Sequence, residues 1–305
     1  MTVVDRGQSY TVWRSKLVQQ MQYDLGLQNL NETAKDLTFT LGYPEIMQGH
    51  DDGMMKTHVT IKSPFDGQMI PVLILSSKTT LSDDRADVVL LIHGHHESID
   101  DMTNVKSQMR GLGSQLARAG FVVLAPEIRS FGEFEINHKG HGAYIRKKAD
   151  GEFLREVLAD MFSVTEFAKQ RYKNFRSLNV VGHSLGGYIA LHFSALNPAI
   201  QRTVISGMFF PYACINTNYH HACQHFSQFE EAAEFSDVAG LIAPRKLLVH
   251  FGRDDKYYTP AVISIFHRAQ RIYEDQGAKD AIVLEVNPGR KHEINPETVL
   301  PFLKN

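Results

Sequence analysis

The chain has 305 residues, of which 43% are hydrophobic and 22% are charged, and its formal net charge at pH 7 is −2. This balance indicates a globular protein with a full-sized core, and the lack of a basic excess argues against a nucleic-acid-binding protein. The longest apolar run, residues 88–92, is too short to cross a bilayer, and the first residues lack the pattern of a secretory signal. We therefore expect a cytoplasmic protein that binds neither nucleic acid nor membranes.

The first 80 residues predict a helix followed by a hairpin. Apolar residues at helical spacing favour a helix within residues 9–30; they are Trp13, Leu17, Met21 and Leu25. Strand-like segments at 57–61 and 68–75 flank Pro64-Phe65-Asp66-Gly67, whose composition is typical of a turn. A second subunit can pack on such an extension, so the sequence is compatible with a homo-oligomer as well as with a monomer.

From residue 88 onward, strand-like and helix-like segments alternate. The expected strands are 88–92, 121–124, 178–181, 203–205, 246–251 and 282–286. The expected helices are 102–119, 152–172, 185–196, 260–273 and 296–303. Such alternation predicts an α/β fold with a mostly parallel central sheet and helices on both of its faces.

One segment, residues 209–239, breaks this alternation and is rich in aromatic residues and histidines. Because α/β proteins bind ligands beyond the carboxyl ends of their strands, we expect a small cap or pocket wall there, near the active site. We interpret residues 1–305 as a single domain in which residues 1–80 form an N-terminal extension. Two partly buried thiols, Cys214 and Cys223, are favoured over a local disulfide bridge.

The strongest functional signal is Gly182-His183-Ser184-Leu185-Gly186-Gly187, which has the form G-x-S-x-G. A strand-like run leads into it and a helix-like run leads out, as a nucleophile elbow requires. Small residues are needed at Gly182 and Gly186 because the turn is too tight for side chains, and the strained backbone lifts the Ser184 hydroxyl above the sheet. We therefore predict Ser184 as a catalytic nucleophile.

A serine nucleophile needs a base that is held by an acid, and in this fold the chain order is Ser, then Asp or Glu, then His. Asp254 and Asp255 directly follow the predicted strand 246–251, and His292 lies in the loop after the last strand. The oxyanion of the reaction needs two backbone N–H donors. We assign them to Leu185, at the start of the helix, and to His95, in the loop after the first apolar strand.

Together these residues resemble the α/β-hydrolase superfamily from about Val88 to the C-terminus. His93-Gly94 is similar to its oxyanion loop, and Gly252-Arg253-Asp254-Asp255 is similar to its G-x-x-D segment, which places the acid on Asp255. Residues 126–132 and 242–248 resemble the acetyl xylan esterase and dienelactone-hydrolase-related branch. Dienelactone hydrolases proper use a cysteine nucleophile, whereas this chain has Ser184. The resemblance implies an α/β-hydrolase fold with a serine nucleophile.

Further polar residues near these motifs are candidates for binding the substrate. They are His183, His220, His221 and Tyr257. His221 and His225 also have the i, i+4 spacing of two metal ligands, but the glutamate of an H-E-x-x-H motif is absent and no third ligand is placed by the sequence. No dinucleotide or phosphate-loop motif is present. We therefore expect neither a metal nor a cofactor.

The resulting hypothesis is a serine carboxylesterase that acts through Ser184, His292 and Asp255 on a small acyl ester. We expect the acyl group to be acetyl and the alcohol to be a small molecule or a carbohydrate. A peptidase or amidase of the same fold is one alternative, although the chain has no room for the propeller domain of a prolyl oligopeptidase. A non-catalytic binding protein on the same scaffold is another, although such proteins typically lose a triad member.

Overall fold

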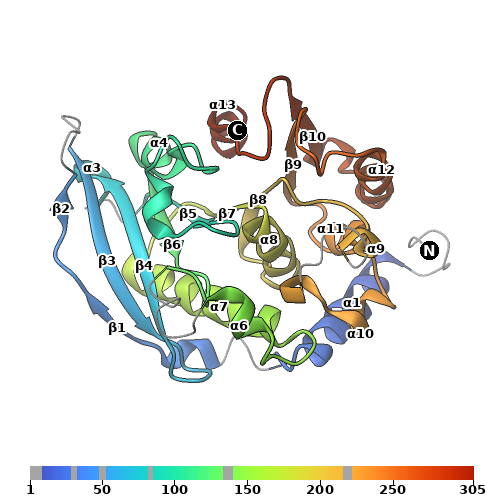
Figure 1. Ribbon diagram of the computed structural model, residues 1–305, viewed down its shortest axis with the longest axis horizontal. Coiled ribbons are helices and arrows are strands. Elements are labelled where there is room, and N and C mark those ends of the chain that lie inside the picture. The colour runs from blue at the N-terminus through green and yellow to red at the C-terminus, as the bar shows by residue number, and fades with distance from the viewer. Residues whose placement is uncertain (1–8, 29–32, 48–52, 82–84, 133–139, 216–221) are drawn as a thin grey trace.

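The structure, a computed structural model, describes residues 9–28, 33–47, 53–81, 85–132, 140–215 and 222–305. One mixed sheet runs through the molecule in the order β1-β3-β4-β6-β5-β7-β8-β9-β10, and β2 pairs with β3 (Figure 1). Its strands are β1 (Thr38–Leu41), β2 (Glu45–Ile46), β3 (Met54–Lys62), β4 (Met69–Ser77), β5 (Asp87–Ile92), β6 (Phe121–Pro126), β7 (Leu178–His183), β8 (Ile200–Ser206), β9 (Lys246–Gly252) and β10 (Ile282–Asn287).

The sheet changes from antiparallel to parallel at β6. Strands β6, β5, β7, β8, β9 and β10 pair in parallel, whereas β1, β2, β3 and β4 form antiparallel pairs and β4 joins β6 antiparallel. Residues 88–92 of β5 are fully buried, as expected for a strand covered on both faces. The parallel strands bring their carboxyl ends to one edge, where ligand sites of α/β proteins form.

Helices cover both faces of this sheet. On one face α4 (Leu112–Arg118) and α13 (Pro296–Lys304) pack on the strands. The other face carries α7 (Glu152–Arg171), α8 (Leu185–Leu196), α11 (Phe235–Gly240) and α12 (Pro260–Asp275), and α1 (Tyr10–Asp24) packs against this layer. In Figure 1, α4 and α13 lie above the sheet and α7 and α1 lie below it. The expected fold class, a mostly parallel sheet between two helical layers, is confirmed.

The N-terminal elements have clear causes in the sequence. Buried Trp13, Leu17 and Met21 form the inner face of α1, and the Tyr10 hydroxyl donates to the carbonyl oxygens of Gly240 and Ala243 at 2.9 and 2.7 Å. The predicted hairpin is formed by β3 and β4, which pair from Lys62 opposite Met69 outward. Strands β1 and β2 were not expected, because they are short and their residues are exposed.

The predicted helix over residues 102–119 is wrong in its first half. Residues 99–102 form a 3₁₀ turn, and α4 begins only at Leu112. Short polar side chains hold the segment between them in turns, because Ser107 donates to the carbonyl oxygens of Asp101 and Asn104. Arg110 and Gly111 both have positive φ angles, which a helix does not allow.

Shorter helices complete the described chain. They are α3 (Lys78–Leu81), α6 (His141–Ile145), α9 (Tyr212–Cys214) and α10 (Ser227–Glu230), with 3₁₀ turns at Ala34–Asp36, Ala222–Gln224 and Lys279–Ala281. The described part of residues 209–239 is thus built of short helical pieces between β8 and β9. Within the described residues, no helix has both the length and the apolar character that a transmembrane segment needs.

Candidate active site

Ser184 occupies a strained turn between β7 and α8. Its backbone has φ 53° and ψ −118°, a region that residues with a side chain rarely adopt. A β-carbon at Gly182 would overlap the carbonyl oxygen of Gly186, and one at Gly186 would overlap that of Ile92. Both positions therefore need glycine. The Ser184 N–H donates to the carbonyl oxygen of Ser206 at 2.8 Å, which ties the turn to the next strand, and the residue stays partly exposed.

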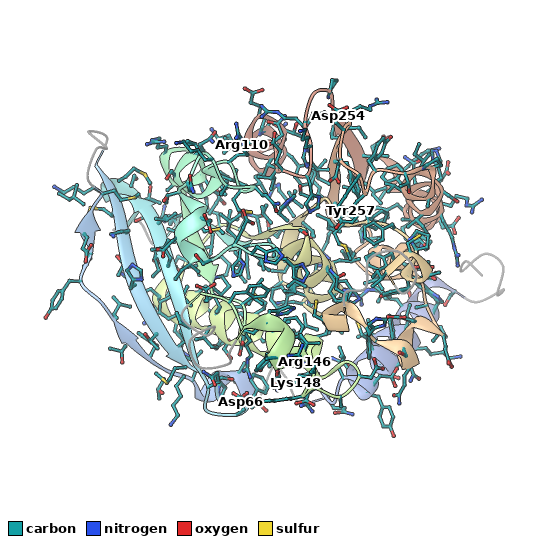
Figure 2. The ribbon with its side chains drawn as sticks, in the orientation of Figure 1. Asp66, Arg110, Arg146, Lys148, Asp254 and Tyr257 are labelled. Carbon is teal, nitrogen blue, oxygen red and sulfur yellow. The ribbon has the colours of Figure 1, made fainter. Side chains whose placement is uncertain are left out.

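His292 and Asp255 form a pair at the same edge of the sheet. Nδ1 of His292 lies 2.7 Å from Oδ2 of Asp255, whose side chain is buried. The other carboxylate oxygen of Asp255 accepts from the Tyr257 N–H at 2.9 Å. This second contact fixes the orientation of the carboxylate. The neighbouring Asp254 is exposed at the periphery, as Figure 2 shows, and its carboxylate makes no such contact within the described residues.

The His292 ring packs against buried polar side chains that contact one another. Its centroid lies 4.6 Å from that of His183, and a β-carbon at Gly207 would lie 2.8 Å from His292 Cε1. The Ser206 hydroxyl is 3.0 Å from His183 Nδ1 and 2.9 Å from His250 Nδ1. Burial lowers the pKa of His183 well below its usual range and lowers that of His250 to about 4. Both imidazoles are therefore neutral at pH 7.

From His250, the series of hydrogen-bonded polar side chains continues toward the loop that carries His292. His250 Nε2 lies 2.7 Å from Oδ1 of Asn287, which also accepts from Asn295 Nδ2 and the Thr298 hydroxyl at 3.0 and 2.9 Å. Sequence reasoning missed His250, Ser206 and Asn287. The available signal was a polar residue near the carboxyl end of each of three consecutive parallel strands.

The loop after β5 passes close to Ser184. A β-carbon at Gly94 would lie 3.1 Å from Cβ of Ser184, so only a glycine leaves this approach undisturbed. Glu97 clamps the loop, because Oε2 accepts from the Gly94 N–H at 3.1 Å and Oε1 accepts from the Met109 N–H at 3.2 Å. Burial raises the pKa of Glu97. This carboxyl was also missed by sequence reasoning, since it acts on the backbone and not on a motif.

The structure distributes the remaining predicted binding residues differently. The Tyr257 ring lies 4.8 Å from the His292 ring in an edge-to-face arrangement, and Tyr257 is half-buried. The prediction that His183 contacts the substrate does not fit the structure, because its side chain is fully buried beneath His292. His220 and His221 lie outside the described residues.

This edge of the sheet thus holds the partly exposed Ser184 and the His292 imidazole, which is paired with the buried carboxylate of Asp255. Within the described residues no hydrogen bond joins the Ser184 hydroxyl to His292. Such contacts are often long before substrate binds and close in the Michaelis complex. Leu185 is the first residue of α8, so its N–H has no partner inside the helix and lies at the positive end of the helix dipole.

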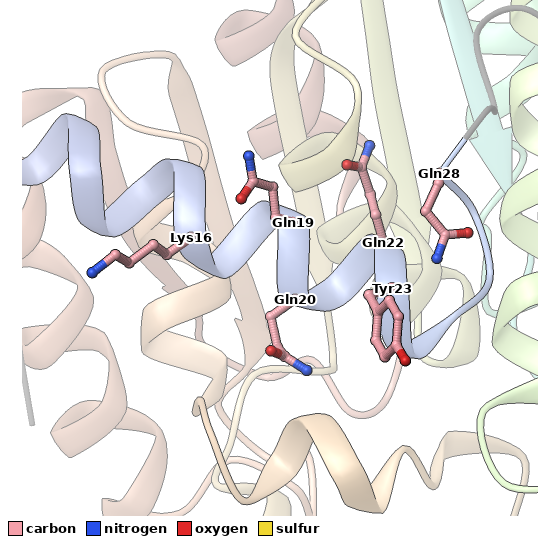
Figure 3. Close-up of a pocket in the computed structure, with 6 residues that line it drawn as sticks. All are labelled: Lys16, Gln19, Gln20, Gln22, Tyr23 and Gln28. Carbon is pink, nitrogen blue, oxygen red and sulfur yellow. The ribbon is translucent and has the colours of Figure 1, made fainter.

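Neither the two thiols nor a hollow beside α1 brings a second nucleophile into the candidate site within the described residues. Cys214 and Cys223 are both free thiols, and burial raises the pKa of Cys223 to about 12. A hollow of about 650 Å³ is lined by residues of α1 and by Gln28, as Figure 3 shows. Its wall carries amides, one ammonium group and one phenol, but none of the candidate site residues.

Comparison with known proteins agrees with this arrangement. Residues 83–228 match the family model described as serine aminopeptidase, S33. This match confirms the expected resemblance to the α/β-hydrolase superfamily. The matched segment contains the loop after β5 and the turn at Ser184, and it ends before Asp255 and His292. No curated protein matches this chain.

Several solved structures share the fold. Methylesterase BT1017 superimposes with a TM-score of 0.71 at 16% identity over 96% of this chain, which spans only 62% of that protein. A proposed acetyl xylan esterase (BF1801) from Bacteroides fragilis gives 0.72 at 13% identity, covering 97% and 87% of the two chains. A glucuronoyl esterase from Solibacter usitatus gives 0.65 at 14% identity, covering 90% of each. At such low identity these likenesses establish the fold alone.

Proposed function

We propose that this protein is a serine carboxylesterase that hydrolyses a small acyl ester through Ser184, His292 and Asp255. The observation that carries the proposal is the 2.7 Å contact between His292 Nδ1 and the buried carboxylate of Asp255, at the sheet edge where the strained elbow presents Ser184. A base oriented by a buried acid next to a raised hydroxyl is the arrangement that activates serine.

The reaction begins when Nε2 of His292 accepts the proton of Ser184 and the serine oxygen attacks the ester carbonyl. Asp255 keeps the imidazole in the tautomer with the proton on Nδ1, and its charge stabilises the imidazolium that forms. His292 then donates its proton to the departing alcohol, and an acyl-Ser184 intermediate remains. A water molecule, deprotonated by His292, releases the acid and restores the serine.

The oxyanion that forms in each half-reaction needs donors that are in place beforehand. The amides of Leu185 and His95 supply them in this proposal, because one opens α8 and the other follows Gly94, which lies against Ser184. Each such donor contributes about 3 kcal/mol to lowering the barrier. The contacts of Glu97 with the backbone keep the second donor in position.

The acyl group we propose is acetyl, carried by a carbohydrate or another small polar alcohol. The three fold relatives named above are described as esterases, and one of them is a proposed acetyl xylan esterase. In this proposal the described part of residues 209–239 and Tyr257 form the wall against which the substrate packs, because Tyr257 lies beside His292 and 6.1 Å from Phe210 in a stacked arrangement.

Replacement of the nucleophile tests the proposal. Ser184→Ala should abolish hydrolysis of p-nitrophenyl acetate and labelling by a fluorophosphonate probe, while circular dichroism shows a folded protein. Ser194→Ala is a matched control, because this serine lies on the same helix but is buried against Thr203. A Ser184→Ala variant that keeps most of the activity would contradict the assignment.

An amidase or peptidase is the second candidate, and the family description, serine aminopeptidase, favours it. The same triad can cleave either bond, so a panel of matched acetyl esters, acetyl anilides and aminoacyl anilides decides between the two. The carboxylesterase proposal requires that esters turn over and amides do not. A folded protein that neither reacts with the probe nor cleaves either class would instead be a binding protein.

A further inference from the structure

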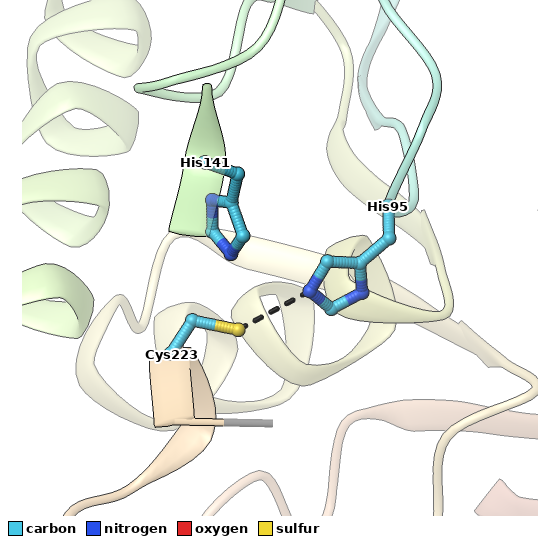
Figure 4. Close-up of side chains that lie close together, drawn as sticks. All are labelled: His95, His141 and Cys223. Carbon is cyan, nitrogen blue, oxygen red and sulfur yellow. Dashed lines mark hydrogen bonds between the residues drawn. The ribbon is translucent and has the colours of Figure 1, made fainter. Parts of the chain in front are cut away.

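A second group of reactive side chains lies beside the candidate active site. His95, His141 and Cys223 come from the oxyanion loop, from α6 and from the insertion between β8 and β9, and one ligand atom of each lies within 4.8 Å of the other two (Figure 4). His95 Nε2 is 3.2 Å from Cys223 Sγ. Three segments far apart in sequence thus bring two imidazoles and a thiol to one point.

The surrounding residues hold these rings in place. Phe131 stacks on the His141 ring at 4.5 Å and meets the His95 ring edge-to-face at 5.9 Å. The Ser130 hydroxyl lies 2.6 Å from His141 Nδ1. A histidine that binds a metal through one nitrogen usually gives the other to an oxygen partner, and His141 has this partner already.

The loop that carries Ser130 and Phe131 is itself anchored. The guanidinium of Arg129 donates from Nε and Nη2 to the two carboxylate oxygens of Asp160, each at 2.7 Å, and both side chains are buried. Such a bidentate contact fixes the geometry of the loop. The arrangement around His141 therefore has a rigid support.

We propose that His95, His141 and Cys223 bind a zinc-class divalent metal ion. Around a tetrahedral zinc ion, a thiolate sulfur and an imidazole nitrogen lie about 3.6 Å apart. The 3.2 Å between His95 Nε2 and Cys223 Sγ is close to this value, and a ligand atom of His141 lies within 4.8 Å of both. The ligand set of two nitrogens and one sulfur is one that zinc and cobalt accept.

Binding exchanges one proton for the ion. The Cys223 thiol loses its proton to solvent, its sulfur and one nitrogen of each histidine bind the metal, and a water molecule takes the fourth position. A cavity of about 240 Å³ borders Cys223. Apolar Ile145 and Phe153 and charged Lys148 and Asp150 are among the residues that line it.

The ion would join the oxyanion loop to the insertion. His95 carries the amide that we assign to the oxyanion hole, and Cys223 belongs to the insertion that we assign to the substrate wall. A metal bond between them would fix both at once, which sequence reasoning could not find because no two ligands share a local motif. The role proposed for the metal is therefore positional and separate from the chemistry of Ser184.

The test uses the full chain, freed of metal with a chelator and titrated with Co²⁺ as an optical probe. We expect one equivalent to bind with thiolate-to-cobalt charge-transfer absorption, and Zn²⁺ to displace it and raise the melting temperature. Cys223→Ser should remove the charge-transfer band and weaken binding on the order of 100-fold. His141→Ala should weaken binding by at least about 10-fold while the band remains.

Cys214→Ser and Ser184→Ala are the matched controls, because the first removes the other free thiol and the second removes the nucleophile. Both should bind cobalt as the unchanged protein does. The absence of a thiolate band in the unchanged protein, or undiminished binding by folded Cys223→Ser, would overturn the proposal. Since the readout is optical and thermal, its failure leaves the esterase proposal unaffected, and the reverse also holds.

Discussion

Two layers of histidines lie at the carboxyl edge of the sheet, and they differ in their partners. The lower layer, His183 and His250, is fully buried and contacts hydroxyl and amide groups. The upper layer, His292, His95 and His141, is partly exposed and contacts a carboxylate, a thiol and a hydroxyl. In our proposals the same type of side chain is a neutral support in the lower layer and a catalytic or metal-binding group in the upper layer.

This difference indicates that the atom contacting an imidazole determines what that histidine can do. A buried imidazole without a carboxylate stays neutral and gives shape to the loops above it. An imidazole held by the carboxylate of Asp255 can accept a proton and be stabilised as a cation. Substitutions and acidification can test this difference.

Asp255→Asn should cause the largest loss. The amide cannot stabilise the imidazolium and favours the wrong tautomer of His292, so we expect kcat for p-nitrophenyl acetate to fall about 10³- to 10⁴-fold. Asp254→Asn is the matched control, since that carboxylate is exposed, and its kcat should stay within about 2-fold. Equal losses in both variants would show that the 2.7 Å contact is not the catalytic one.

Lowering the pH should decrease the free energy of unfolding through the buried histidines. Burial lowers the pKa of His192 and His250 to about 4, below the value near 6.5 of an unfolded chain. Between those values the unfolded chain binds protons that the folded chain does not, so the free energy of unfolding falls as the pH falls. The loss reaches about 3 kcal/mol for each histidine between pH 6.5 and pH 4.

Urea unfolding measured from pH 7 to pH 4 checks this expectation, and His192→Gln isolates one contribution. His192 lies on α8, away from the candidate triad, with Nδ1 2.8 Å from the Tyr188 carbonyl oxygen and Nε2 2.8 Å from the Tyr212 hydroxyl. Its variant should lose stability less steeply with acid than the unchanged protein. An identical slope would rule out His192 as a source of the pH dependence.

Gly207→Ala should disturb the boundary between the two layers. Its φ of +68° strains any side chain, and a β-carbon there would lie 2.8 Å from His292 and 3.1 Å from His183. Gly277 has φ +66° with no atom within 4 Å of the added carbon, so Gly277→Ala carries the strain alone. Gly277→Ala should lose about 1 kcal/mol of stability, and Gly207→Ala should lose more because its added carbon also crowds the two rings.

Only Gly207→Ala should also lower kcat, by about 10- to 100-fold, because a displaced imidazole no longer meets the serine. Steady-state kinetics and thermal melting of both variants measure the two effects separately. A Gly207→Ala enzyme with unchanged kcat would mean that the His292 ring tolerates displacement.

The sequence was sufficient to predict features that depend on local backbone sterics, and features in which a short motif directly follows a strand. The elbow, the helix after it and the alternation of strands and helices are of this kind. The start of α4 was not predictable in the same way, because Ser107 competes for backbone carbonyls in a segment that has helical spacing. The spacing of apolar residues gives no information on that competition.

The support beneath His292 was missed for a different reason. His183, Ser206 and His250 are register partners on three adjacent parallel strands, so their contact depends on the pairing of β7, β8 and β9. The sequence separates His183 from His250 by 67 positions, and only the sheet register brings them together. The cluster of His95, His141 and Cys223 was hidden by the same kind of distance.

The backbone of Ser184 has one more consequence, for durability. A residue with a side chain at φ 53° and ψ −118° costs the fold about 1–3 kcal/mol, which glycine would not pay. Loss of the nucleophile by Ser184→Gly would thus make the protein harder to melt. The hydroxyl that we propose as the nucleophile thus lowers the thermal stability of the protein, and selection for heat resistance alone would remove it.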